Sequence, residues 1–245
     1  NTGNVRVWDA EGTLAGFLLS TMLNCGGDKG TVLELDEQTD AQLANLRKSL
    51  HSILNIEDGS TEDQTTCNLL ELGAGQAGLA GLALASAASN CTEDGNITTK
   101  PLHIVLTDGH PKCVENNKVC AKMLLSESSD SRAAQCIDTH LLLWDSSNSK
   151  GRDACREINN LVKEEVLQKM NDDEGQYHIC LASDCVHFQE FHNGLLLTIA
   201  RTLAVNGFAL LCQPRRGTSL HNFMTLVDTV NEKAMQQTDD TTNQS

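Results

Sequence analysis

The stretch Asn68–Ala85, NLLELGAGQAGLAGLALA, decides the fold. Its apolar run Leu69–Leu72 is typical of a short buried strand and includes one acid, Glu71. A turn without bulky side chains follows at Gly73–Gly75, and Gln76–Ala85 is predicted to be a helix of small residues. Glycine allows backbone angles that are closed to other residues and lets a ligand approach the main chain. The stretch therefore predicts the first strand–loop–helix unit of a nucleotide-type α/β fold, with the functional site at the carboxyl end of the strand.

Further apolar runs of strand length alternate with helical patterns along the rest of the chain. The predicted strands are Leu102–Thr107, Thr139–Leu143, Tyr177–Ser183 and Gly207–Cys212. The predicted helices are Pro111–Leu124, Asp153–Lys169, Phe191–Leu203 and Ser219–Ala234. Five strands that alternate with helices predict an α/β fold, a parallel sheet with helices on both faces.

The N-terminal part of the chain has a different composition. Apolar residues at helical spacing predict a helix over Glu11–Cys25, and a second helix is expected at Asp40–Ile56 inside a polar insertion. We therefore divide the chain into an N-terminal helix with its insertion (1–66), the α/β domain (67–235) and a disordered tail (236–245).

Composition limits the classes of partner. The 245 residues include 40% hydrophobic residues, enough for a core, and the net charge is −15. This charge argues against nucleic acid or an anionic membrane surface as partner, and it is compatible with a cationic ligand or a basic peptide. No run of 18 apolar residues exists, so we expect no membrane span. Because the sequence starts at Asn1 without a methionine, we expect it to be a fragment.

The ten cysteines are scattered along the chain without a CxxC pair. This pattern predicts buried free thiols in a reducing compartment, and no metal site. We accordingly expect a cytoplasmic or nuclear location.

Acidic residues stand at the ends of four predicted strands, as Glu71, Asp108, Asp145 and Asp184. A single acid in such a place is commonly a helix cap or a turn former. Because the carboxyl ends of parallel strands meet at one edge, four acids there would together hold a cation.

The segment Gly73–Gly78 matches the GxGxxG fingerprint of dinucleotide-binding enzymes. However, Glu71 would repel a pyrophosphate, and Asp108 lies 30 residues beyond Gly78 rather than about 20. The polar loop 90–101 offers one explanation for that surplus, so a nicotinamide dehydrogenase stays open as an alternative. S-adenosylmethionine (SAM), which has a ribose, an adenine and a cationic tail, fits these residues better. Asp108 would then bind the ribose hydroxyls, Glu71 would lie near the cationic end, and Trp144-Asp145 would flank the adenine.

The motifs follow one another in a fixed order along the chain. They are Val7-Trp8, Glu71–Gly75, Leu106–Gly109, Leu143–Asp145 and Ala182–Cys185, followed by PRRGTSLHNF at 214–223. This series resembles the seven-β-strand SAM-dependent methyltransferases and, within them, the family of protein-lysine methyltransferases. The resemblance covers residues 5–25 and 67–228. It implies a Rossmann-like sheet, of which the last two strands are missing from this sequence.

The resemblance also implies roles for individual residues. The positions implied to contact the cofactor are Trp8, Glu71, Gly73, Ala74, Gly75, Asp108, Gly109, Trp144, Asp145 and Ser183. Asp184 matches the acid of the family's (Asp/Glu)-x-x-(Tyr/Phe) motif near the site of transfer, but His187 stands where the aromatic residue is expected. His187 is interpreted either as a partly buried neutral histidine or as a base, and Cys185 as a packed thiol.

The resulting functional prediction is a SAM-dependent protein-lysine N-methyltransferase, with calmodulin as the leading candidate substrate. Calmodulin is acidic, so the local basic pair Arg215 and Arg216 is the expected contact for it. A methyltransferase of another protein and a non-catalytic SAM-binding module are the alternatives. The missing last strands and His187 favour the non-catalytic SAM-binding module.

Overall fold

Five parallel strands form one sheet in the computed structural model, which describes residues 7–23, 37–54, 66–91, 100–127, 136–144 and 177–242. The strands are β1 (Cys67–Leu72), β2 (Leu102–Asp108), β3 (Ile137–Leu141), β4 (Tyr177–Ser183) and β5 (Leu203–Cys212). The helices are α1 (Asp9–Leu23), α2 (Glu37–Leu54), α3 (Leu79–Cys91), α4 (Pro111–Glu127), α6 (His192–Thr202) and α7 (Ser219–Thr242), with a short 3-10 helix η2 (Gln189–Phe191) before α6. The predicted α/β class is confirmed.

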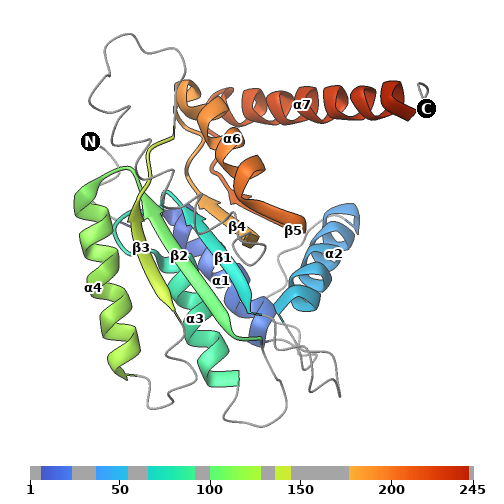
Figure 1. Cartoon of the computed structure of the whole chain (residues 1–245). Helices are drawn as coiled ribbons and strands as arrows, with labels where there is room; N and C mark the ends of the chain where they lie inside the picture. Colours follow the sequence, from blue (N-terminus) through green and yellow to red (C-terminus); the bar gives the residue numbers. More distant parts are fainter. Residues whose placement is uncertain are drawn as a thin grey trace.

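The strand order β3-β2-β1-β4-β5 places β1 at the centre of the sheet (Figure 1). Leu70 pairs with Val105 of β2 on one side and with Cys180 of β4 on the other. The chain fills the sheet outward from β1 to β3, and then starts again on the other side of β1 with β4. The order therefore reverses between β1 and β4, and in open α/β sheets ligands bind at such a point, beyond the carboxyl ends of the strands.

One face of the sheet is covered by α1, α3 and α4. Leu69, Ile104 and Ile179 lie on this face and are buried, and they pack in one cluster with Leu18 of α1 and Leu84 of α3. Since α1 contributes to this core, the N-terminal helix packs as part of the α/β layer.

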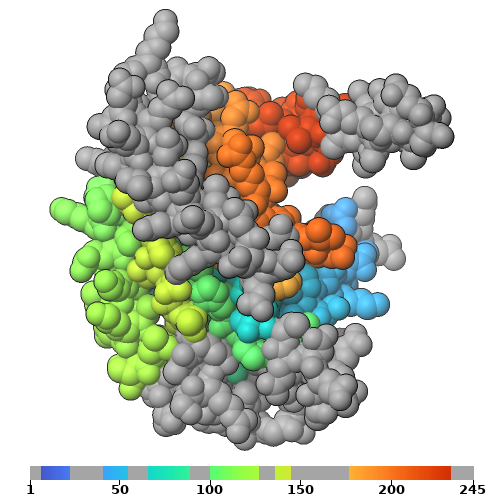
Figure 2. Space-filling view, viewed as in Figure 1, coloured from blue at the N-terminus to red at the C-terminus, as the bar shows by residue number. Residues whose placement is uncertain are grey.

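The other face is covered by α6 and the first turns of α7. Leu70, Cys180 and Leu195 belong to the cluster on this side, and Phe223 anchors α7 in it. In the view of Figure 2, α4 and β3 lie at the left of the surface in green and yellow-green, and α6 and α7 lie at the upper right in orange and red. Adjacent residues of the buried strands belong to the hydrophobic clusters on opposite faces, because side chains alternate across a sheet.

Several boundaries differ from the sequence-based expectation. α3 begins at Leu79 rather than Gln76, because Gly78 has a positive φ of 56° and closes a turn by donating to the Ala74 carbonyl at 2.9 Å. β3 begins and ends two residues early, at Ile137–Leu141, so Trp144 follows the strand instead of ending it. β5 begins at Leu203, four residues before Gly207, since Leu203 already pairs with Tyr177.

The end of the chain also differs from the prediction. α7 was expected to end at Ala234, but it continues through Thr242 and so enters the segment 236–245, for which we expected disorder. The expected helix at Asp153–Lys169 lies outside the described residues. None of the described helices is long and apolar enough to cross a membrane. The seven cysteines whose side chains are described have free thiols.

Gly81 of α3 lies where the helix approaches the sheet most closely. A Cβ at this position would be 2.7 Å from Leu106 Cδ2 and 2.8 Å from Glu71 Oε2, two groups that are themselves buried. We expect Gly81→Ala to lower the free energy of unfolding by about 1–3 kcal/mol through overpacking, although alanine ordinarily favours a helix. Urea denaturation of the purified chain measures this change.

Gly16→Ala in α1 is the matched control, because a Cβ on Gly16 meets nothing within 4 Å. At Gly16 the substitution changes only the helix propensity, so we expect the free energy of unfolding to rise by about 0.5–1 kcal/mol. Equal effects of the two substitutions would contradict the close packing of α3 on β1 and β2.

Candidate functional site

The loop between β1 and α3 forms the floor of the candidate site. Gly73 and Gly75 have φ values of 64° and 60°, in the left-handed region that favours glycine. The Ala74 N–H donates to the Thr107 carbonyl at 2.8 Å, which ties the loop to the end of β2. The Thr107 hydroxyl in turn donates to the Glu71 carbonyl at 2.8 Å. The loop is thus held to the two central strands at the carboxyl edge of the sheet.

Two carboxylates occupy the N-terminus of α3. The Leu79 N–H donates to Glu11 Oε1 at 2.9 Å, and the Gly81 N–H donates to Glu71 Oε2 at 2.7 Å. The first N–H groups of a helix have no partner within the helix, and the helix dipole adds partial positive charge there. Glu11 from α1 and Glu71 from β1 are both buried. They give these N–H groups acceptors and place acidic side chains at the positive end of the helix dipole.

A third carboxylate holds the loop from β2. Asp108 Oδ2 accepts the Gly75 N–H at 2.9 Å, and Oδ1 accepts the His110 N–H at 2.8 Å. A carboxylate has about four acceptor positions, so these two bonds fix the orientation of Asp108 and leave acceptor capacity for a ligand.

Burial changes the charge that these acids carry. Desolvation raises the pKa of Glu71 to about 8, although the Gly81 N–H opposes the shift. Desolvation is also the main cause that raises the pKa of Glu11 and of Asp108. Glu71 is therefore mostly protonated at neutral pH and contributes little to a negative potential. We expected Glu71 to face the cationic end of a ligand, but in the structure it lies beneath α3 and supports the loop.

Trp144 and Cys185 lie over Gly73. A Cβ at Gly73 would be 2.7 Å from Cys185 Sγ and 3.2 Å from Trp144 Cη2, so only glycine fits beneath them. The Trp144 Nε1–H is buried and has no hydrogen-bond partner among the described residues. Buried polar groups without a partner are rare, so the Trp144 Nε1–H beside the glycine loop is a candidate donor to a ligand or a water molecule.

Cys185 is half-buried, and its thiol is neutral. It donates to the Leu72 carbonyl at 3.3 Å and to the Ser183 carbonyl at 3.2 Å. Its pKa is raised, first by desolvation and then by the negative charges of Asp108, Glu71 and Asp184. A nucleophilic cysteine requires a lowered pKa, so Cys185 is a packed thiol, as expected. These three acids, from the ends of β1, β2 and β4, thus all lie near enough to affect this thiol electrostatically.

The acid that follows β4, Asp184, is paired with a basic side chain. Asp184, with a positive φ of 52°, forms an ion pair with Arg216, with Nη1 and Oδ2 3.0 Å apart. The Arg216 guanidinium also lies 5.4 Å from the centre of the Trp8 ring, within the range of a cation–π contact. Arg216, which we expected to contact an acidic substrate, is therefore already paired with Asp184 in this structure. Arg215, next to it, is exposed.

The remaining predicted residues have different surroundings. His187 is exposed, not partly buried, and its ring contacts Phe188 edge-to-face with centroids 4.7 Å apart. Ala74 and Ser183 are buried and Gly109 is exposed. Asp145 lies outside the described residues.

Glu11 was missed by the sequence analysis. It lies on the buried face of α1, in line with Leu14 and Leu18 at helical spacing. An acid within an apolar helical stripe indicates a buried carboxylate that accepts hydrogen bonds from the fold, because a buried carboxylate requires donors.

The occupied N-terminus of α3 decides between two kinds of ligand. In dinucleotide-binding folds the pyrophosphate binds to the free N–H groups at this helix end. Here Leu79 and Gly81 already donate to carboxylates, and a phosphate would meet Glu11 and Glu71. The geometry favours a ligand without phosphates, bound along Gly73–Gly75 and Asp108.

Comparison with known proteins gives one related sequence. The chain is 28% identical over 158 residues to calmodulin-lysine N-methyltransferase from Arabidopsis thaliana. The match covers 64% of this chain and 40% of that protein, so the chain spans well under half the length of this relative. No protein-family model matches the sequence.

Solved structures with a related arrangement include three of very low identity. A SAM-dependent methyltransferase from Geobacter sulfurreducens in complex with S-adenosyl-L-homocysteine is 13% identical, with a TM-score of 0.33 over 79% of this chain and 53% of that one. Coclaurine N-methyltransferase with N-methylheliamine and SAH is 14% identical, with a TM-score of 0.32 over 83% and 48%. YjhP from E. coli is 10% identical, with a TM-score of 0.32 over 79% and 54%. Scores this low carry no argument about function.

The raised pKa of Glu71 predicts a pH-dependent stability. Between the ordinary pKa of 4.5 and the folded-state value of about 8, the folded chain holds a proton that the unfolded chain has lost. This group therefore lowers the free energy of unfolding as pH rises through that window, by up to about 1.4 kcal/mol per pH unit. Glu71→Gln removes the titration, so its stability relative to wild type should increase from pH 5 to pH 8 in urea denaturation.

Glu115→Gln on the exposed side of α4 is the control, and its profile should run parallel to wild type. Parallel profiles for Glu71→Gln as well would mean that Glu71 is ionised in the folded chain at neutral pH.

Proposed function

We propose that this chain binds S-adenosylmethionine at the carboxyl edge of its sheet and acts as a protein-lysine N-methyltransferase. The observation that carries the proposal is Asp108, a carboxylate fixed by two backbone N–H groups directly beside the glycine loop. An oriented acid with spare acceptor positions suits the two neighbouring hydroxyls of a ribose. Asp184, the other partly exposed acid described at this edge, is paired with the Arg216 side chain instead of with backbone N–H groups.

The rest of the edge is chemically suited to this cofactor. Gly75 leaves the main chain open to close approach, since a Cβ there would meet only Glu11 at 3.7 Å. Trp144 offers an aromatic surface and a buried Nε1–H without a partner among the described residues. Asp108 supplies a carboxylate for a cationic ligand, while the N-terminus of α3 is unsuited to a pyrophosphate. These features favour SAM over a nicotinamide dinucleotide.

The related Arabidopsis protein supports the same proposal through its name, calmodulin-lysine N-methyltransferase. The matching region includes more than half of this chain, although it is less than half of that protein. Calmodulin is therefore the first substrate to test. Arg215, which is exposed, is the candidate contact for an acidic substrate, since Arg216 is already paired with Asp184.

When bound, SAM supplies an electrophilic methyl group on a positively charged sulfur. A lysine at pH 7 must first lose its proton, which costs about 4–5 kcal/mol given a reference pKa of about 10.4. Asp184 lies beside the half-buried Cys185 and has a left-handed backbone conformation, with its carboxylate paired with Arg216. In our proposal Asp184 orients the amine, and the exposed His187 accepts the released proton.

A non-catalytic SAM-binding module remains the second candidate. Two observations favour it: His187 replaces the aromatic residue that the family resemblance implies, and Arg216 neutralises Asp184. Such a module would bind the cofactor at the same residues without transferring its methyl group. Transfer of label therefore separates the two candidates.

We expect Asp108→Asn to weaken SAM binding. The amide places an NH₂ group against the Gly75 or His110 N–H, so the side chain loses its fixed orientation and its charge. Hydrogen bonds to charged groups contribute about 1.5–3 kcal/mol, which corresponds to roughly a ten- to hundredfold loss of affinity in isothermal titration calorimetry. Asp228→Asn on the exposed side of α7 is the control and should bind like wild type. Unchanged affinity of the Asp108 variant would contradict the assigned pocket.

Catalysis is tested by incubating the chain with radiolabelled SAM and a panel of proteins that includes calmodulin. We expect label on a lysine of one of these proteins, located by mass spectrometry, and at least a tenfold lower rate, about 1.4 kcal/mol, for Asp184→Ala. Binding of SAM without transfer to any protein of the panel or of a cell lysate would favour the binding module.

A further inference from the structure

His103, Cys136 and Asp138 form a cluster on the sheet that takes no part in the proposed methyl-transfer site. The pairing of β2 with β3 brings them together: Ile104 pairs with Ile137, and the Ile104 N–H donates to the Cys136 carbonyl at 2.9 Å. Both isoleucines pack in the core on the α3 side. Because side chains alternate along a strand, His103, Cys136 and Asp138 all point away from that core, to the other face.

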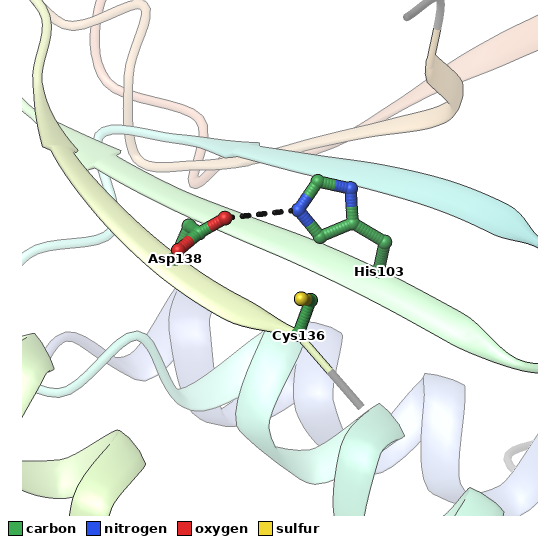
Figure 3. Close-up of side chains that lie close together, drawn as sticks. All are labelled: His103, Cys136 and Asp138. Atoms are coloured by element: carbon green, nitrogen blue, oxygen red, sulfur yellow. Dashed lines mark hydrogen bonds and ion pairs between the residues drawn. The ribbon is translucent and has the colours of Figure 1, made fainter. Parts of the chain in front are cut away.

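The donor atoms of these side chains converge. His103 Nε2 lies 3.1 Å from Asp138 Oδ2, and the ligand atoms of all three residues lie within 4.8 Å of one another. Figure 3 shows the His103 ring facing Asp138, with the Cys136 sulfur turned toward the same space. Ligand atoms around a tetrahedral zinc ion are separated by about 3.3–3.7 Å, given bond lengths of about 2.0–2.3 Å. Small side-chain rotations are sufficient to reach this geometry.

We propose that His103, Cys136 and Asp138 form a binding site for a divalent metal ion of the zinc type. Imidazole nitrogen, thiolate sulfur and carboxylate oxygen are the three donor types that zinc accepts in proteins. The thiolate selects against magnesium and calcium, which prefer oxygen ligands only. Three protein ligands leave a fourth position for water.

An ordinary surface ion pair explains the cluster less well. The His103 and Asp138 side chains are 30% and 42% exposed, and pairs of this kind contribute about 0–1 kcal/mol to stability. Such a pair gives no reason for an exposed thiol to point at the same place. A metal ion uses all three groups, and it would fasten β3, the edge strand, to β2.

The cluster is separate from the proposed cofactor site. His103 is the second residue of β2, whereas Asp108 is the last, so the two sites lie toward opposite ends of the same strand. The sequence analysis predicted no metal site because the cysteines lack the usual spacing. The three ligands come from two segments more than 30 residues apart, and strand pairing alone brings them together.

Cobalt(II) is a suitable probe, because zinc is spectroscopically silent and cobalt(II) takes the same tetrahedral ligands. The full chain, kept reduced with a phosphine, is titrated with cobalt(II) and followed by absorption. We expect one equivalent to produce a thiolate-to-cobalt charge-transfer band that zinc then abolishes. Cys136→Ser should lose the band, and His103→Ala and Asp138→Asn should each weaken binding at least about tenfold.

Cys120→Ser on α4 is the matched control, because this half-buried thiol lies on another element and should leave the titration unchanged. A full-strength band in Cys136→Ser, a band that depends on Cys120, or no band in wild type would each overturn the proposal. Because none of the three residues is fully buried, the variants are expected to fold, and Asp138→Asn gives an independent measurement beside Cys136→Ser.

Discussion

Three carboxylates that accept hydrogen bonds from the backbone hold the β1–α3 loop in place, and the candidate site depends on them. Glu11, Glu71 and Asp108 come from three different elements, and their partners are Leu79, Gly81 and Gly75. The Gly81–Glu71 bond is buried and the other two are partly buried, and each pairs one backbone donor with one carboxyl acceptor. The same bonds occupy the helix end that a pyrophosphate would need, and they leave Asp108 as the acid that still has acceptor capacity beside the loop. Structural support and ligand preference therefore have a common origin.

The glycines of this loop matter as much for packing as for backbone freedom. Gly73 lies beneath Trp144 and Cys185, and Gly78 and Gly81 lie against Leu106. Without side chains at these positions, α3 can approach the sheet closely enough for Glu71 to reach the Gly81 N–H from below. The close approach buries Glu71, raises its pKa and removes most of its charge at neutral pH. A residue that looks like part of a negative rim in the sequence is thus a neutral support in the structure.

Much of the fold could be predicted because its signals are local. The mostly apolar run of β4 predicted its bounds, Tyr177–Ser183, to the residue, and the acids at the strand ends marked the edge at which Asp108 and Asp184 lie. The partners of those acids could not be predicted. The pairing of Asp184 with Arg216 and the cap that Glu11 gives α3 join segments far apart in the sequence, and depend on how helices pack on the sheet.

Hydrogen exchange at the start of α3 tests the account most directly. Amide protons in the first turn of a helix ordinarily exchange quickly, because they have no partner within the helix. If Glu11 and Glu71 accept from Leu79 and Gly81, these two amides should exchange as slowly as amides of the central strand β1, as measured by NMR on the labelled chain. Exchange at the rate of an exposed peptide would show that the helix end is open to a phosphate, and the preference for S-adenosylmethionine would lose its physical basis.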